Sequence, residues 1–99
     1  MQKVQETAEK IRTMEIRGAG RIAKAAAEAV RDYAAGLDAA SMEEFSARIR
    51  EVSSYLISTR PTAVSLPNAV KLASKYSSGN VEEARQEIIE NANRFIEEA

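Results

Sequence analysis

Apolar residues recur at intervals of three and four along almost the whole chain, and this spacing constrains the fold more than any other feature. The first stretch shows the pattern clearly, with Val4, Ala8, Ile11 and Met14. Residues with this spacing lie on one face of a helix, which we expect over residues 2–15. Strand-like alternation of useful length occurs nowhere outside residues 62–66. The sequence therefore predicts an all-α fold, a small bundle of about five helices.

Glycine, proline and capping residues separate five such stretches. After the first helix, the pattern predicts helices over residues 19–35, 41–57, 68–77 and 81–99. Gly36 and Gly79 are expected to end the second and the fourth of the five. The second helix has alanines on its inner face, which let neighbouring backbones come close. We therefore expect it to be the central helix.

Two helix starts have the spacing of a capping box, in which a short polar residue is followed three residues later by an acid. They are Ser41 with Glu44 and Asn80 with Glu83. In this arrangement the first side chain accepts a bond from the first turn, and the acid reaches back to the first residue. The third and fifth helices should therefore begin directly after Ser41 and Asn80.

Composition excludes several classes of function. The 14 basic and 15 acidic residues leave a net charge of -1, so we expect no nucleic-acid partner that depends on bulk positive charge. The 99 residues are enough for one domain, and they include no Cys and no His. We therefore expect no metal site, no cofactor and no catalytic residue in this chain. Neither a signal peptide nor an apolar run of 18 residues is present, so we expect a cytoplasmic protein without a membrane partner.

The stretch Arg17-Gly-Ala-Gly-Arg21 is the first candidate binding site, because it places two glycines directly before an alanine-rich helix. Gly18 and Gly20 let a ligand approach the backbone closely. No Ser, Thr, Asp or Asn stands between Met14 and Ala23, so no capping side chain occupies the free N–H groups of the first turn. Such a helix start favours an anion. The alternative is that these small residues simply allow two helices to pack closely.

The second candidate is the loop of residues 58–67, which contains Arg60 and two prolines. Pro61 and Pro67 stiffen this connection. The planar guanidinium of Arg60 is suited to bidentate contact with phosphate. Hydroxyl groups that could assist it come from Thr59, Thr62 and Ser65. The alternative is a stiff connector with Arg60 in solvent.

In combination, Arg17-Gly-Ala-Gly20 and Thr59-Arg-Pro-Thr-Ala-Val-Ser-Leu-Pro-Asn-Ala-Val70 resemble the N-terminal helical domain of archaeal ribose-1,5-bisphosphate isomerases. These enzymes share a family with the initiation factor 2B alpha, beta and delta subunits and with methylthioribose-1-phosphate isomerases. The resemblance covers essentially all 99 residues. Methylthioribose-phosphate isomerases look similar but typically have Pro at the position of Gly20, and this chain departs from them there.

The resemblance implies conversion of ribose 1,5-bisphosphate to ribulose 1,5-bisphosphate in AMP metabolism by a full-length homo-oligomer. Substrate-binding residues would be Arg17, Gly18, Ala19, Gly20 and Arg60. In that family the catalytic Cys and Asp lie in a C-terminal Rossmann-like domain. Residues 1–99 would then be the N-terminal domain of a longer chain and inactive by themselves. The alternative is a regulatory or protein-interaction domain of the initiation factor 2B type.

Overall fold

The computed structural model describes residues 2–16, 18–60 and 64–98, and these form five helices and no strand. The helices are α1 (Gln2–Arg12), α2 (Ala19–Gly36), α3 (Met42–Thr59), α4 (Ser65–Ala73) and α5 (Val81–Glu98). The all-α prediction is therefore confirmed. None of the helices in the described ranges combines the length and the apolar character that crossing a membrane requires.

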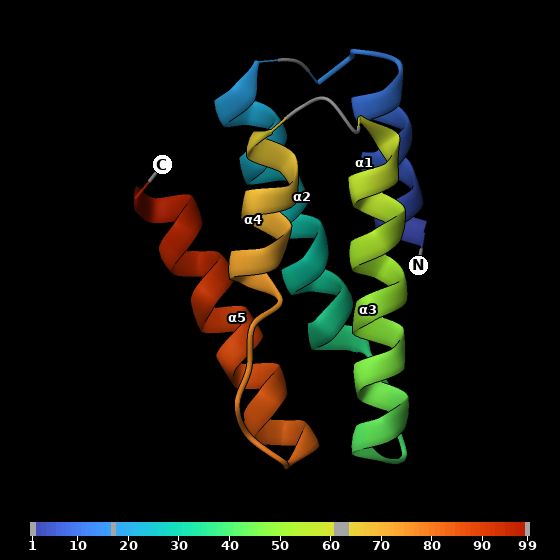
Figure 1. Ribbon diagram of the computed structural model, residues 1–99, viewed down its shortest axis with the longest axis vertical. Helices are drawn as coiled ribbons and strands as arrows, with labels where there is room; N and C mark the ends of the chain where they lie inside the picture. The colour runs from blue at the N-terminus through green and yellow to red at the C-terminus, as the bar shows by residue number, and fades with distance from the viewer. Residues whose placement is uncertain (1, 17, 61–63, 99) are drawn as a thin grey trace.

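Successive helices run in alternate directions along the long axis of the molecule (Figure 1). The connections that follow α1 and α3 consequently lie at one end of the bundle, and those that follow α2 and α4 lie at the other. The first of these ends, which carries Gly18 and Arg60, is called the upper end here. The central position expected for α2 is confirmed, since it packs against all four other helices.

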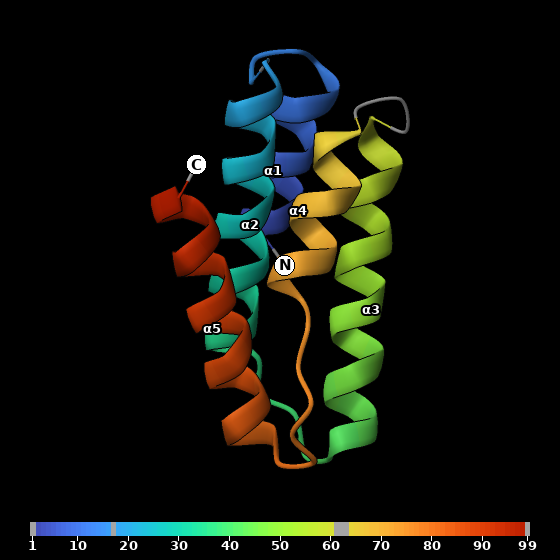
Figure 2. The ribbon, with the colours of Figure 1, turned by 60° about the vertical axis from the view of Figure 1, so that its left-hand side comes forward.

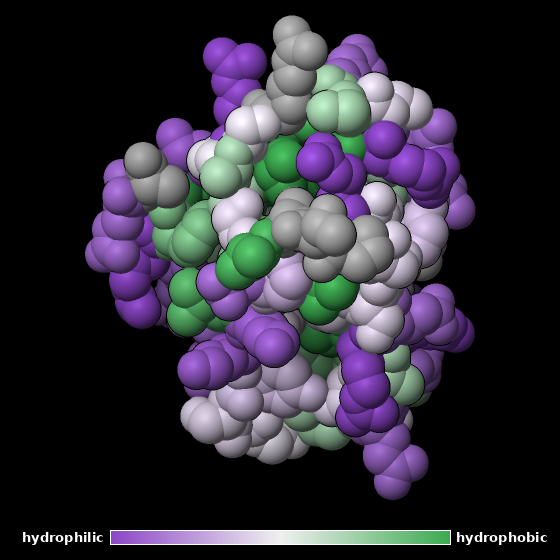
Figure 3. Space-filling view, turned by 45° about the horizontal axis from the view of Figure 1, so that its top comes forward, coloured by the Kyte–Doolittle hydropathy of each residue, from purple (hydrophilic) through white to green (hydrophobic). Residues whose placement is uncertain are grey.

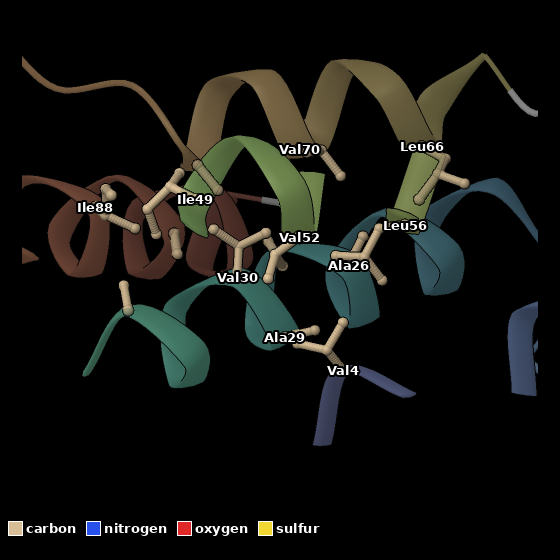
Figure 4. Close-up of a cluster of buried hydrophobic side chains, with 14 of the residues drawn as sticks. Val4, Ala26, Ala29, Val30, Ile49, Val52, Leu56, Leu66, Val70 and Ile88 are labelled. Carbon is tan, nitrogen blue, oxygen red and sulfur yellow. The ribbon is translucent and has the colours of Figure 1, made fainter. Parts of the chain in front are cut away.

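Small residues on α2 bring its neighbours close. Ala26, Ala27 and Ala29 are completely buried, and Val30 is almost so. Figure 4 shows the side chains around them, from Val4 of α1, Ile49, Val52 and Leu56 of α3, Leu66 and Val70 of α4, and Ile88 of α5. Each helix thus contributes its apolar stripe to one continuous core, which stabilises the bundle by removing apolar surface from water.

Both predicted helix caps are present. The Ser41 hydroxyl accepts a bond from the Glu44 amide at 3.2 Å, and the side-chain oxygen of Asn80 accepts one from the Glu83 amide at 3.1 Å. The acid at the first cap reaches one residue further back than a capping box requires, because Glu44 accepts from the amide of Ala40 at 3.3 Å. The starts of α3 and α5 are therefore stabilised locally.

Replacing Ser41 by Ala is expected to lower the free energy of unfolding by about 1 kcal/mol, because the Glu44 amide loses its acceptor. Denaturant unfolding followed by circular dichroism measures this loss. Ser54→Ala is the matched control, since Ser54 is an exposed serine inside the same helix. An equal loss in both variants would contradict a specific role for the cap.

The first helix ends earlier than predicted, at Arg12 rather than near residue 15. Met14 has a left-handed backbone with a φ of 67°, and the Ile16 amide turns back to the carbonyl of Lys10 at 3.0 Å. Met14 is 52% exposed, so its expected place in the apolar stripe was wrong. Ile16, after the turn, packs against the core instead.

The end expected for the second helix at Gly36 is confirmed within one residue, whereas the stop expected at Gly79 was wrong. Gly36 is the last residue of α2, and the chain leaves the helix at Leu37, whose backbone is extended. The fourth helix begins and ends earlier than the predicted 68–77. Pro67 already lies within its first turn, and Ser74 follows its last residue. Gly79 therefore does not close it.

The segment between α4 and α5 is held by side chains from α3 and α5. Tyr76 packs edge-on against the buried Phe45, with ring centroids 5.6 Å apart, and its hydroxyl contacts that of Ser46. The Glu87 carboxylate accepts bonds from the amides of Ser78 and Ser77 and from the Ser77 hydroxyl. These bonds, that of the Ser78 amide foremost, lower the pKa of Glu87 below its ordinary value of 4.5.

This segment is expected to loosen in acid. A carboxyl group whose pKa is lowered in the folded state contributes stability above its unfolded pKa, and this contribution is lost as the pH falls through the folded pKa. The amide chemical shifts of residues 77 and 78 should therefore titrate together with a midpoint below 4.5. Glu87→Gln should abolish this titration, whereas Glu90→Gln, at an exposed position of the same helix, should leave it in place.

Candidate anion-binding site

The start of α2 is open to a ligand. The first bond within the helix runs from the Ile22 amide to the Gly18 carbonyl at 3.0 Å, so the N–H groups of Ala19, Gly20 and Arg21 have no partner inside the helix. No described side chain caps this end, and its first turn contains no acid. The absence of a cap, which the sequence predicted, is thus confirmed for the described residues.

The two glycines leave space beside these N–H groups. Gly18 is the residue before the helix and has a φ of 91°, a conformation that other residues rarely adopt. Apart from the adjacent residues and the backbone of α2 itself, no described atom lies within 4 Å of the place where a side chain would begin at Gly18 or Gly20. Ala19 is exposed between them, and Arg17 lies outside the described residues. An anion can therefore approach this backbone directly, with the positive end of the helix dipole behind it.

Arg60 directly follows the last residue of α3, at the same upper end (Figure 2). Its side chain is half-buried, and the Nη1 atom is shielded from water without a hydrogen-bond partner among the described residues. A buried charged donor that lacks a partner is costly, because it has lost its water and gained no acceptor. The described structure thus has a guanidinium with one unsatisfied donor at the upper end.

The hydroxyl groups near Arg60 differ from the expectation. The Thr59 hydroxyl donates to the Leu56 carbonyl at 2.7 Å, and the Ser65 hydroxyl donates to the Ala19 carbonyl at 3.1 Å. Their protons are therefore already engaged, and the prediction that these hydroxyls act as free donors around Arg60 was wrong. Thr62 lies outside the described residues.

The bond between Ser65 and Ala19 brings the two candidate segments together. It joins the first residue of α4, five positions after Arg60, to the first residue of α2. Both views of the ribbon show the two connections at the same end of the bundle (Figures 1 and 2). The sequence could not reveal this contact, because its partners are 46 residues apart.

The surface at the upper end is mixed in character. Figure 3 turns this end towards the viewer and shows strongly hydrophilic side chains next to apolar ones. Two apolar side chains near the connections are largely solvent-exposed, Val64 at 74% and Met14 at 52%. The described residues contain no group of three or more acidic side chains that could hold a metal ion. The chain contains no Cys and no His, so neither a thiol nucleophile nor an imidazole base is present.

A second hollow, between α5 and the segment after α4, suits an anion less well. It has a volume of about 530 Å³, and its lining includes the cations Lys75 and Arg94. Glu87 also lines it, and the lowered pKa of this carboxyl group keeps it negative at neutral pH. A phosphate group there would face a fixed negative charge, so the upper end is the better candidate.

Comparison with known families defines the class of protein. The model of the initiation factor 2 subunit family matches residues 15–99, which include both candidate segments. The chain therefore belongs to this family.

The similar proteins of known name are mainly sugar-phosphate isomerases. The chain is 50% identical over 93 residues to the ribose 1,5-bisphosphate isomerase of Methanocaldococcus jannaschii, an alignment that covers 94% of the chain and 30% of that protein. It is 49% identical over 96 residues to the same enzyme of Archaeoglobus fulgidus, covering 97% of the chain and 30% of that protein. The resemblance inferred from the two arginine motifs is thereby confirmed.

A more distant relative carries a different name. The methylthioribose-1-phosphate isomerase of Symbiobacterium thermophilum is 45% identical over 62 residues, covering 63% of the chain and 17% of that protein. The chain spans about 30% of the length of the ribose 1,5-bisphosphate isomerases described above.

Proposed function

We propose that this chain is the N-terminal, substrate-binding domain of a ribose-1,5-bisphosphate isomerase. The complete enzyme would convert ribose 1,5-bisphosphate to ribulose 1,5-bisphosphate in AMP metabolism. Identity of about 50% to archaeal enzymes of that name, over nearly the whole chain, supports this assignment. The complete enzyme is proposed to be a cytoplasmic homo-oligomer without a nucleic-acid partner.

One observation at the upper end carries the proposal. The uncapped start of α2 and the unpaired Nη1 atom of Arg60 belong to segments that the bond from Ser65 to Ala19 holds together. Free backbone N–H groups and a guanidinium are both typical ligands of phosphate. A bisphosphate offers two phosphate groups, so one substrate could engage both the start of α2 and Arg60.

The chemistry itself is assigned to another part of a longer polypeptide. An aldose-ketose isomerisation moves a proton between neighbouring carbon atoms, and this requires a positioned acid or base. The chain contains no Cys and no His, and the family resemblance places the catalytic Cys and Asp in a C-terminal domain. Arg17, Gly18, Ala19, Gly20 and Arg60 are accordingly proposed to bind substrate rather than to transform it.

The proposal is tested by measuring turnover of ribose 1,5-bisphosphate with residues 1–99 alone and with the complete polypeptide. We expect turnover by the complete polypeptide and none by residues 1–99. Turnover by the purified 99-residue chain would show that the assignment of the chemistry is wrong. A complete polypeptide that is folded but inactive, and that binds an initiation factor instead, would favour the regulatory alternative.

A further inference from the structure

Ser65 uses its hydroxyl in an unusual way for a residue at a helix start. A serine at the N-cap position commonly accepts a bond from the first turn, but Ser65 is the first residue inside α4 and Val64 is the N-cap. Ser65 instead donates to the Ala19 carbonyl of α2 at 3.1 Å. The start of α4 has no capping side chain among the described residues, since the preceding residue is Val64. The hydroxyl therefore serves α2 rather than its own helix.

The bond acts on the peptide group that carries the central N–H donor of the candidate site. The carbonyl of Ala19 and the amide of Gly20 belong to one planar trans unit, so they point in opposite directions. The Ser65 hydroxyl therefore holds the carbonyl end of this peptide group, whose N–H belongs to Gly20 in the uncapped first turn of α2. Accepting a hydrogen bond at the carbonyl also polarises the peptide group and strengthens its N–H as a donor.

We propose that Ser65 is a positioning residue of the anion site, which orients and polarises the Gly20 N–H through the Ala19 carbonyl. The same bond joins the start of α2 to the start of α4, whose first residue stands five positions after Arg60. The identity of the ligand rests on the function proposed above. The effect on the Gly20 amide does not rest on the proposed function, because it is a property of the chain without ligand.

The first test is made without ligand, by nuclear magnetic resonance on the chain. Ser65→Ala should shift the Gly20 amide resonance and slow its base-catalysed hydrogen exchange, since the peptide group loses the partner that polarised its N–H. Ser65→Thr should restore both, because it keeps the hydroxyl. Ser54→Ala, at an exposed position of α3, should change neither. An unchanged Gly20 amide in Ser65→Ala would overturn the proposal whatever the ligand is.

The second test measures the KM and kcat of the complete polypeptide for ribose 1,5-bisphosphate. Loss of one hydrogen bond that supports a donor should raise KM roughly three- to tenfold in Ser65→Ala, with kcat little changed and with rescue by Ser65→Thr. A merely structural role would instead lower the melting temperature and kcat together. An unchanged KM would also overturn the proposal. If the wild-type protein does not turn over the substrate, the proposed function fails, and the shift of the Gly20 amide still decides the role of Ser65.

Discussion

Arg60→Ala is expected to weaken binding of ribose 1,5-bisphosphate to the complete polypeptide by roughly one to two powers of ten. A charge-assisted hydrogen bond is worth about 1.5 to 3 kcal/mol, and each 1.4 kcal/mol is about a factor of ten in affinity. The Nη1 atom of Arg60 is buried and has no hydrogen-bond partner among the described residues. A bound phosphate group would therefore gain a donor that has already lost its water. Calorimetric titration of the Arg60→Ala protein with substrate measures the effect.

The stability of the fold should hardly change in this variant. Arg60 follows the end of α3, and removing a charge that is unpaired in the described structure takes away an unfavourable term. Arg50→Ala is the matched control, because it removes an exposed arginine from the same helix and should leave substrate affinity unchanged. Arg60→Lys should recover only part of the affinity, since an ammonium group cannot make the bidentate contact. Equal affinity of wild type and Arg60→Ala would exclude Arg60 from the site.

Features that depend on neighbouring residues could be predicted from the sequence. The caps at Ser41 and Asn80 are local, because the side chain and the amide that it serves are three residues apart. The apolar stripes also follow from short spacing, and they identified α2 as the central helix. The open start of α2 could be predicted as well, since it follows from the absence of any capping residue nearby.

Features that depend on distant residues could not be predicted from the sequence. The end of α2 is held by Arg85 of α5, whose Nε and Nη2 atoms donate to the carbonyls of Ala34 at 3.0 Å and Leu37 at 2.6 Å. Helix α1 ends early because Ile16 returns to the core after the left-handed residue Met14. The sequence placed the end of α1 about three residues too late, whereas it placed the end of α2 within one residue.

The candidate site also combines residues that the sequence indicated with a contact that only the structure revealed. Gly18 and Gly20 stood out in the sequence because they directly precede an uncapped helix, and Arg60 stood out because it lies in a proline-stiffened loop. The contact that joins their two segments, from Ser65 to Ala19, became evident only in the folded chain. A hydroxyl that seemed to be a ligand donor thus proved to be a link between two helices.

Gly20→Val should separate binding from stability more sharply than any other change in this chain. Gly20 lies in the first turn of α2, and a side chain there would meet no described atom within 4 Å. Its φ lies outside the left-handed range, so valine causes no backbone strain. Valine is also a better helix former than glycine, and we expect the free energy of unfolding to stay equal or to rise by roughly a few tenths of a kcal/mol.

Substrate binding should nevertheless fall by about one to two powers of ten, because the branched side chain occupies the space through which a phosphate group reaches the N–H donors. Gly36→Val is the matched control. Gly36 lies at the opposite end of the same helix, is also exposed, and has equally open space around it. Calorimetric titration and thermal unfolding of both variants in the complete polypeptide give the two quantities. If Gly20→Val binds ribose 1,5-bisphosphate as tightly as Gly36→Val does, the start of α2 does not contact the substrate, and the glycines serve helix packing or chain geometry alone.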